Sequence, residues 1–395
     1  MAKKRQKKVV SRRSLTLLLI GLAAVVAMMI YKLGSLVGGV SAAEQAAATA
    51  PVGWHSIYHQ PLDLPLKLVR LAVFSLFNDH DQTLTRLPNV LFGALAIISF
   101  GWVVKLWHGA RTALFATALF ATSAWVLHAS RLATFDVMYL WTIPALLLAQ
   151  AKMQRANNRA WVFYGSMLLW GLLIYIPGVV WLVLVSVWWQ RAAIANGWRQ
   201  FNRWWQRLAY LLAGLVWLPL LGYSLQNLTL LRTWLGLPLH FASALPLLKN
   251  FGGVFVHLFI RGPQYPQLWL ERAPILDIFT AAMFLIGLYF YVQHWKASRS
   301  RVLGTFFVLG AVLVALGGSV GLSLLVPLLY LVAATGIAYL VREWLQTFPL
   351  NPLARSVGIT IIVAAVALSC LYNLRAYFVA WPHNSVTTTV FRYHL

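Results

Sequence analysis

Residues 15–30 read LTLLLIGLAAVVAMMI, an apolar run that, with its neighbours over 14–33, is long enough to cross a lipid bilayer as one helix. Basic residues crowd the segment before it, at Lys3, Lys4, Arg5, Lys7, Lys8, Arg12 and Arg13. No small-residue cleavage site follows the run directly, so we expect an uncleaved anchor rather than a signal peptide. Residues 1–13 are then a basic cytoplasmic tail.

The composition of the whole chain indicates an integral membrane protein. Of its 395 residues, 61% are hydrophobic and 10% are charged, which excludes a soluble globular domain. The net charge of +24 comes from short basic clusters between apolar runs, an arrangement that orients membrane proteins. We therefore expect no nucleic-acid partner. Cys370 is the only cysteine, so no disulfide can form within one chain.

Windows of about 20 apolar residues predict about eleven membrane spans in an all-α polytopic protein. The predicted spans cover 14–33, 87–105, 112–128, 137–151, 160–176, 178–190, 208–223, 274–293, 302–316, 321–341 and 356–377. Two pairs are joined by tight turns, Ile176-Pro177-Gly178 and Gly317-Gly318-Ser319, which favours antiparallel neighbours.

The charges predict the orientation of the chain. With the N-terminus in the cytoplasm, most Lys and Arg residues fall on the cytoplasmic side, in short loops such as 191–207 and 296–301. The acidic residues fall outside or at the outer boundary, except Glu343. We expect a multi-pass protein of the inner (plasma) membrane whose active site faces away from the cytoplasm.

Two outer segments, 34–86 and 224–273, are much longer than the other connections, and loops of such length are usually functional. In the first, Lys67 and Arg70 lie among apolar residues over 66–77, which predicts an amphipathic helix along the membrane surface. A second short helix is predicted over 42–50. Residues 1–395 otherwise form a single transmembrane domain.

Glu44 follows the first span in Gly38-Gly39-Val40-Ser41-Ala42-Ala43-Glu44, so it lies near the outer surface, where a carboxylate can act as a base. The alternative is a solvated interfacial carboxylate. Asp79 and Asp81 are weaker candidates, because acids before Arg86 commonly cap or hydrate a turn. His55 and His59 have the i, i+4 spacing of a metal pair, but Trp54, Tyr58 and Pro61 also fit an aromatic interfacial belt.

Arg131 and Asp136 share a short outer loop, where they can form a salt bridge with each other. Alternatively, the planar guanidinium of Arg131 can grip a lipid phosphate through two hydrogen bonds. Asp136 then orients the reacting group or shares a divalent cation with Glu44. No cofactor is certain, and the presence of a metal ion is left open.

Several motifs with defined chemistry are absent. The chain has no phosphate-binding glycine loop, no G-x-S-x-G and no HExxH, so nucleotide-driven transport and the common hydrolase chemistries lack support. No span carries a carboxylate at its midpoint, which weakens an ion-coupled transporter.

The stretch Leu84-Thr85-Arg86-Leu87-Pro88-Asn89-Val90-Leu91-Phe92-Gly93 resembles the segment that opens the second span in bacterial protein O-mannosyltransferases and aminoarabinose transferases (glycosyltransferase family 39-like), which are GT-C membrane glycosyltransferases. Further similarities lie at Ser130-Arg131-Leu132 with Asp136, at 273–277 and at 377–382.

This resemblance implies a helical bundle with two surface helices in the first outer loop and a sugar donor carried on a polyprenyl phosphate. The family has an acidic pair after the first span, one member of which is the catalytic base, and the matching positions here are Ala43 and Glu44. Asp136 matches the acid of the second outer loop.

The resulting hypothesis is an inverting glycosyltransferase with Glu44 and Asp136 as catalytic residues. The acceptor of this enzyme is a protein, a lipid or a glycan. Membrane lipid surrounds the enzyme itself. The candidates for binding the donor are Arg131, Arg86, Lys67, His59, Arg261 and Arg272. Three other readings remain: a lipid or polysaccharide transporter, an O-antigen ligase or polymerase type of enzyme, and a membrane scaffold.

Overall fold

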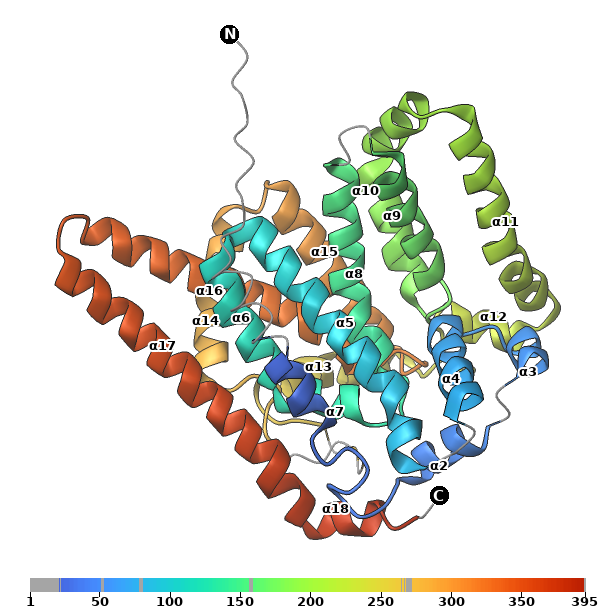
Figure 1. Cartoon of the computed structure of the whole chain (residues 1–395), viewed down its shortest axis with the longest axis horizontal. Helices are drawn as coiled ribbons and strands as arrows, with labels where there is room; N and C mark the ends of the chain where they lie inside the picture. Colours follow the sequence, from blue (N-terminus) through green and yellow to red (C-terminus); the bar gives the residue numbers. More distant parts are fainter. Residues whose placement is uncertain are drawn as a thin grey trace.

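The computed structural model describes residues 21, 23–50, 53–77, 81–155, 159–263, 265, 267 and 272–393, and it is a bundle of helices (Figure 1). In these ranges, β pairing is limited to one isolated antiparallel bridge between Val40 and Tyr393. The N-terminal tail and residues 14–20 and 22 of the first predicted span lie outside the described residues, whereas 23–30 are helical. The predicted all-α class is confirmed.

Three short helices follow the first span: α2 (Ala42–Thr49), α3 (Trp54–His59) and α4 (Leu64–Phe77). Helices α2 and α4 match the two predicted surface helices, whereas α3 was not predicted. Ser41 begins α2 with a capping box: its hydroxyl accepts from the backbone N–H of Glu44, and the Glu44 carboxylate accepts from the backbone N–H of Ser41.

The bundle itself is made of further helices of 8 to 27 residues. These are α5 (Gln82–His108), α6 (Ala110–Thr122), α7 (Ala124–Arg131), α8 (Asp136–Gln154), α9 (Ala160–Leu173), α10 (Val179–Gln200), α11 (Arg203–Gln226), α14 (Ile278–Gln293), α15 (Ser298–Ala315), α16 (Val326–Thr347) and α17 (Pro352–Arg375). Helix α8 is the centre of the core, because every residue from 137 to 150 is buried. A helix that is apolar on all sides requires such a position.

Six of the described helices are long and apolar enough to cross a membrane, or seven if the bent pair α6–α7 is one span. Three shorter apolar helices accompany them: α9, α13 (Ala244–Phe259) and α14. The chain is therefore a multi-pass membrane protein. The predicted number of eleven spans is not reached by this criterion and stays a prediction.

The predicted span 112–128 is bent, not straight. Helices α6 and α7 meet at 61°, and Ser123 between them leaves the helical conformation, with φ −52° and ψ 128°. The Asn373 side chain of α17 accepts a hydrogen bond from the backbone N–H of Ala124 at 3.4 Å, so the break is supported by a polar partner. The second long outer segment is also helical in part, with α12 (Leu228–Trp234) and α13.

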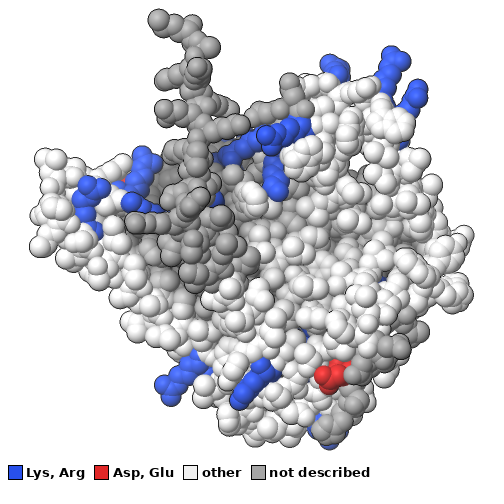
Figure 2. Space-filling view, viewed as in Figure 1, with Lys and Arg blue, Asp and Glu red and all other residues white. Residues whose placement is uncertain are grey.

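The two ends of the bundle differ in charge. The connections α8–α9, α10–α11, α14–α15 and α16–α17 lie at one end, called here the basic end, and Figure 2 shows Lys and Arg side chains around it. The opposite end, called the acidic end, holds α2, α3, α4 and the C-terminal α18 (Ser385–Val390). The described carboxylates at the acidic end are Glu44, Asp63, Asp81, Asp136 and Asp277, whereas Glu343 lies on the part of α16 that reaches the basic end.

Candidate functional site

Two acidic residues from different outer segments lie within electrostatic range of the same tyrosine at the acidic end. Asp63 immediately precedes α4, and Asp136 is the first residue of α8. Tyr139, one turn further along α8, is within electrostatic range of both carboxyls. We call Asp63, Asp136 and Tyr139 the acid cluster.

Asp63 has an unusual backbone and no recorded partner for its carboxyl group. Its φ is 58°, in the left-handed region that few residues other than glycine adopt. An Asp before a helix normally accepts a hydrogen bond from the second or third helical N–H, but the second position here is Pro65, which has none. Among the hydrogen bonds recorded for the described residues, none reaches the carboxyl group of Asp63, which is only 8% exposed.

Burial raises the pKa of the Asp63 carboxyl from its ordinary value near 3.8 to about 7, although the charges of Lys67 and Arg70 oppose this effect. A carboxyl group with such a pKa holds and releases a proton near neutral pH, as a general base does. Strained backbone and a perturbed pKa coincide at one residue, and both features are typical of functional sites.

Asp136 is buried and accepts two hydrogen bonds. Ser323 donates to one oxygen at 3.1 Å, and Thr134 donates to the other at 3.3 Å. Burial raises the pKa of Asp136, while these two hydrogen bonds lower it. The predicted salt bridge with Arg131 does not form, since Arg131 contacts other groups.

Two cations accompany Asp63 on α4. Lys67 is half-buried and donates to the backbone carbonyl of Gln60 at 2.6 Å, and Arg70 donates to the carbonyl of Ala133 at 3.0 Å. Burial lowers the pKa of both side chains. The predicted donor-binding residue Lys67 therefore lies beside the acid cluster.

Glu44 lies in a buried ion pair rather than in an open pocket. One carboxylate oxygen accepts from Nε of Arg86 at 2.8 Å and from the N–H of Ala133 at 3.0 Å. The other accepts from Nη2 of Arg86 and the N–H of Ser41, both at 3.1 Å. Glu44 is fully excluded from solvent and Arg86 is 3% exposed. The remaining Arg86 donors reach the carbonyls of Leu33 and Gly39.

This ion pair belongs to a set of side chains that hold residues 132–135, the connection before α8. Glu44 accepts from the N–H of Ala133 and Arg70 donates to its carbonyl. Asn89, one turn after Arg86 on α5, donates at 2.6 Å to the carbonyls of both Leu132 and Thr134. We call Glu44, Arg70, Arg86 and Asn89 the loop clasp. It fixes the backbone that leads into Asp136.

Arg131 is buried at the end of α7, where its guanidinium lies over the rings of Tyr377 and Phe378 at 5.2 and 4.9 Å. It also donates to the carbonyl of Tyr31. Glu44, Arg86 and Arg131 all interact electrostatically with Tyr377. Their surroundings are dry, however, because Arg131 is only 2% exposed. A guanidinium held in this way is part of the packing between α7 and the C-terminal segment.

The other predicted binding residues lie further out. His59 is exposed in a ring cluster with His55, Tyr58 and Tyr223, in which the two histidine rings are 4.3 Å apart. This contact between α3 and α11 is aromatic packing. In the part of the chain that is described, no three His, Cys, Asp or Glu side chains group as metal ligands.

Arg261 and Arg272 lie near the end of the second long outer segment, where the N–H of Gly262 donates to the carbonyl of Arg272 at 3.0 Å. Arg261 is exposed, and Arg272 has a φ of 61°. Between them, Tyr265 interacts electrostatically with Asp136. This segment therefore passes near the acid cluster.

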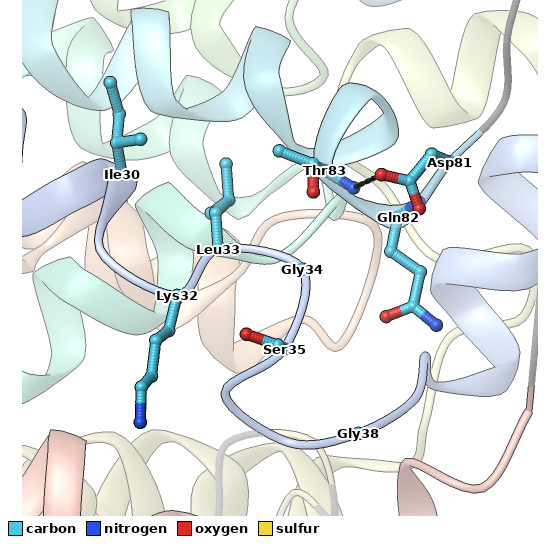
Figure 3. A pocket seen from close by; sticks show the side chains of 9 residues that line it. All are labelled: Ile30, Lys32, Leu33, Gly34, Ser35, Gly38, Asp81, Gln82 and Thr83. Atoms are coloured by element: carbon cyan, nitrogen blue, oxygen red, sulfur yellow. Dashed lines mark hydrogen bonds between the residues drawn. The ribbon is translucent and has the colours of Figure 1, made fainter.

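A pocket of about 610 Å³ lies between the end of the first span and the start of α5 (Figure 3). Lys32 lies on one side of it and Asp81 on the other, with the backbone around Gly34 between them. Asp81 caps α5 by accepting from the N–H groups of Gln82 and Thr83, as expected for an acid at this position, while Asp79 lies outside the described residues. The pocket contains no residue of the acid cluster.

No protein-family model matches the chain, and no curated protein matches its sequence. Solved structures do match its fold. Apo ArnT from Cupriavidus metallidurans is similar over 96% of this chain and 78% of its own, with a TM-score of 0.56 and 14% identity. ArnT bound to undecaprenyl phosphate is similar over 95% of this chain and 77% of its own, with a TM-score of 0.50 and 13% identity.

A third match is the Archaeoglobus fulgidus oligosaccharyltransferase tethered with an acceptor peptide that contains the NVT sequon. It covers 97% of this chain and 56% of its own, with a TM-score of 0.54 and 11% identity. ArnT and the oligosaccharyltransferase are both GT-C glycosyltransferases. The chain has a GT-C fold. The predicted resemblance is thereby confirmed at the level of fold.

Within this GT-C fold, the residues behind the sequence resemblance have clear structural tasks. Arg86 and Asn89, one helical turn apart on α5, belong to the loop clasp, and Asp136 follows the loop that the clasp holds. Asp63 was not among the site residues predicted from the sequence. The available signal was an acid between two prolines, in Pro61-Leu62-Asp63-Leu64-Pro65, within an apolar segment.

Proposed function

We propose that this protein is a membrane glycosyltransferase that moves a sugar from a polyprenyl-phosphate donor to an acceptor. The observation that carries the proposal is a buried carboxyl at Asp63, with a pKa of about 7 and with Lys67 nearby, in a GT-C fold. Tyr139 lies within electrostatic range of both Asp63 and Asp136. A transferase of this kind needs a base for the acceptor and positive charge for the departing phosphate.

In this mechanism, the Asp63 carboxylate removes the proton from an acceptor hydroxyl or amine. The acceptor atom then attacks the anomeric carbon from the face opposite the phosphate, so that configuration inverts. The bond between that carbon and the phosphate oxygen breaks, and the polyprenyl phosphate leaves with the bonding electrons. Asp136, fixed by Ser323 and Thr134, orients the acceptor.

Lys67 is the best candidate for the leaving phosphate, because its ammonium group lies beside Asp63. Arg261 and Arg272 can assist from the segment that passes Asp136. The ArnT crystal structure with undecaprenyl phosphate supports a donor of this chemical class. The acceptor peptide in the oligosaccharyltransferase structure supports a separate acceptor molecule, whose class we leave open among protein, lipid and glycan.

For Glu44, Arg86 and Arg131 we propose positioning roles instead of the catalytic and binding roles expected from the sequence. Both oxygens of Glu44 already accept hydrogen bonds from Arg86 and backbone groups, so no lone pair is left for an acceptor proton. By fixing residues 132–135, the ion pair holds Asp136 in place.

The orientation is also part of the proposal. The acidic end faces away from the cytoplasm of a cell with an inner membrane, because basic connections favour the cytoplasmic side. Reporter fusions at residue 202, in the α10–α11 connection, and in the 235–243 connection test it. Cytoplasmic reporter activity at 235–243 contradicts this orientation.

The test of the activity uses the full chain in liposomes, with a panel of radiolabelled polyprenyl-phosphate hexoses and pentoses and a cell-envelope extract as acceptor. The expected result is label in a product other than the polyprenyl fraction, and release of polyprenyl phosphate. Movement of label across the bilayer without a new glycosidic bond supports a transporter instead. No transfer and no release from any donor overturns the proposal.

A further inference from the structure

The α10–α11 hairpin at the basic end carries a cluster of arginines. Arg199 lies at the end of α10, and Arg203 and Arg207 lie in the first turns of α11; all three are exposed. No Asp or Glu occurs between Asp136 and Glu271 in the sequence, so this part of the chain contains no acid to neutralise them. Figure 2 shows basic side chains projecting at this end of the molecule.

Aromatic side chains fix the hairpin at one depth. Trp198 packs edge-on against Tyr164 and Tyr210, with ring centroids 5.7 and 5.0 Å away, and Trp205 stacks on Tyr164 at 6.0 Å. Gln206 also donates to the carbonyl of Trp198 at 2.7 Å. Trp and Tyr favour the boundary between lipid tails and headgroups. The arginines next to these rings therefore lie at headgroup level.

Below the arginines, α11 presents an apolar surface that the protein leaves uncovered. Of the 18 consecutive residues that make up the most apolar part of α11, only 11% are buried. Leu211 and Leu218 are 65% and 69% exposed, and by helical spacing they share a face with Arg203 and Arg207. One side of α11 thus runs from guanidinium groups to a surface suited to an acyl chain.

We propose that this side of α11, together with Arg199, binds an anionic phospholipid, with the headgroup phosphate on Arg199, Arg203 and Arg207 and an acyl chain along Leu211 and Leu218. Guanidinium groups match phosphate oxygens in geometry and charge. Basic clusters at the ends of membrane helices bind anionic headgroups for the same reason. The inference uses neither the acid cluster nor a sugar donor, so its failure leaves the proposed function intact.

The experiment titrates the purified full chain in neutral detergent with phosphatidylglycerol, and measures bound lipid by native mass spectrometry. Phosphatidylcholine with identical acyl chains tests the requirement for negative charge, and glycerol phosphate tests whether a free phosphate suffices. We expect preferential binding of phosphatidylglycerol. Equal binding of phosphatidylcholine, or full competition by glycerol phosphate at equimolar concentration, overturns the proposal.

The decisive variant is R203Q/R207Q, and its matched control is R342Q/R355Q, which removes the same charge from exposed arginines of the α16–α17 hairpin at the same end. Each arginine near an anionic surface contributes a factor of roughly five, so R203Q/R207Q weakens phosphatidylglycerol binding about 30-fold. The control changes it less than about threefold, and R203K/R207K retains most of the affinity because the charge is kept. Equal weakening by both Gln variants overturns the site.

Discussion

Glu44 and Asp63 belong to the same outer segment and are both nearly excluded from water, yet their surroundings are opposite. Glu44 has Arg86, Ser41 and Ala133 as hydrogen-bond donors, whereas no described donor reaches the carboxyl group of Asp63. A buried carboxylate whose oxygens are all engaged stabilises a structure, and one that is left unpaired near neutral pKa is suited to move a proton. Burial alone does not distinguish the two roles, but the hydrogen-bond partners do.

The largest expected effect comes from removing the unpaired acid. Asp63→Asn abolishes the proposed base, and sugar transfer in the liposome assay falls by about 10²–10⁴-fold, the usual contribution of a general base. The matched control is Asp81→Asn, since Asn caps a helix as well as Asp and Asp81 lies outside the acid cluster. If D63N transfers sugar as fast as D81N, Asp63 is not the catalytic base.

The second largest effect is expected when the ion pair between Glu44 and Arg86 is broken. Glu44→Ala leaves Arg86 buried without its counter-charge, so the free energy of unfolding falls by about 3–5 kcal/mol in mixed-micelle denaturation. The double variant E44Q/R86M removes both charges, and we expect it to lose less stability than E44A does. A stable E44A protein that has lost all transfer activity shows instead that Glu44 takes part in the chemistry.

The pH dependence of stability tests the raised pKa of Asp63. The pKa of Asp63 is about 7 in the folded protein and about 3.9 in an unfolded chain, so between these values the folded state binds the extra proton. The free energy of unfolding of the native protein therefore falls, relative to that of D63N, by up to about 4 kcal/mol as the pH rises from 4 to 7. Parallel stability curves for the two proteins contradict the raised pKa.

The smallest effect is expected at Ala43, the exposed neighbour of Glu44, which matches the first acid of the pair in the family that the sequence resembles. If Asp63 is the base, the carboxylate added by Ala43→Asp takes no part in proton transfer. The rate of sugar transfer then changes less than about tenfold. Ala43→Asn has a similar size without the charge and serves as the control. An increase of several orders of magnitude in A43D alone means that the chain lacks its principal base at position 43.

The sequence alone predicted the membrane class, the surface helices α2 and α4 and the resemblance to GT-C enzymes, because these follow from hydropathy, periodicity and local motifs. It could not predict the bend at Ser123, which depends on a side chain of α17, far away in the sequence. The functional site was harder to predict from the sequence than the fold. Glu44 and Arg131 were selected for their charge and position, but Arg86 and the rings of Tyr377 and Phe378 decide their surroundings.

The bridge between Val40 and Tyr393 has a consequence for biosynthesis. The backbone of the first outer segment exchanges hydrogen bonds with a residue that the ribosome adds hundreds of peptide bonds later, at 2.9 and 3.2 Å. Early helices can insert as they emerge, whereas the segment around Val40 waits for Tyr393 before it completes this bridge. The first outer segment therefore cannot reach its final conformation until Tyr393 has been synthesised, however early its own helices form.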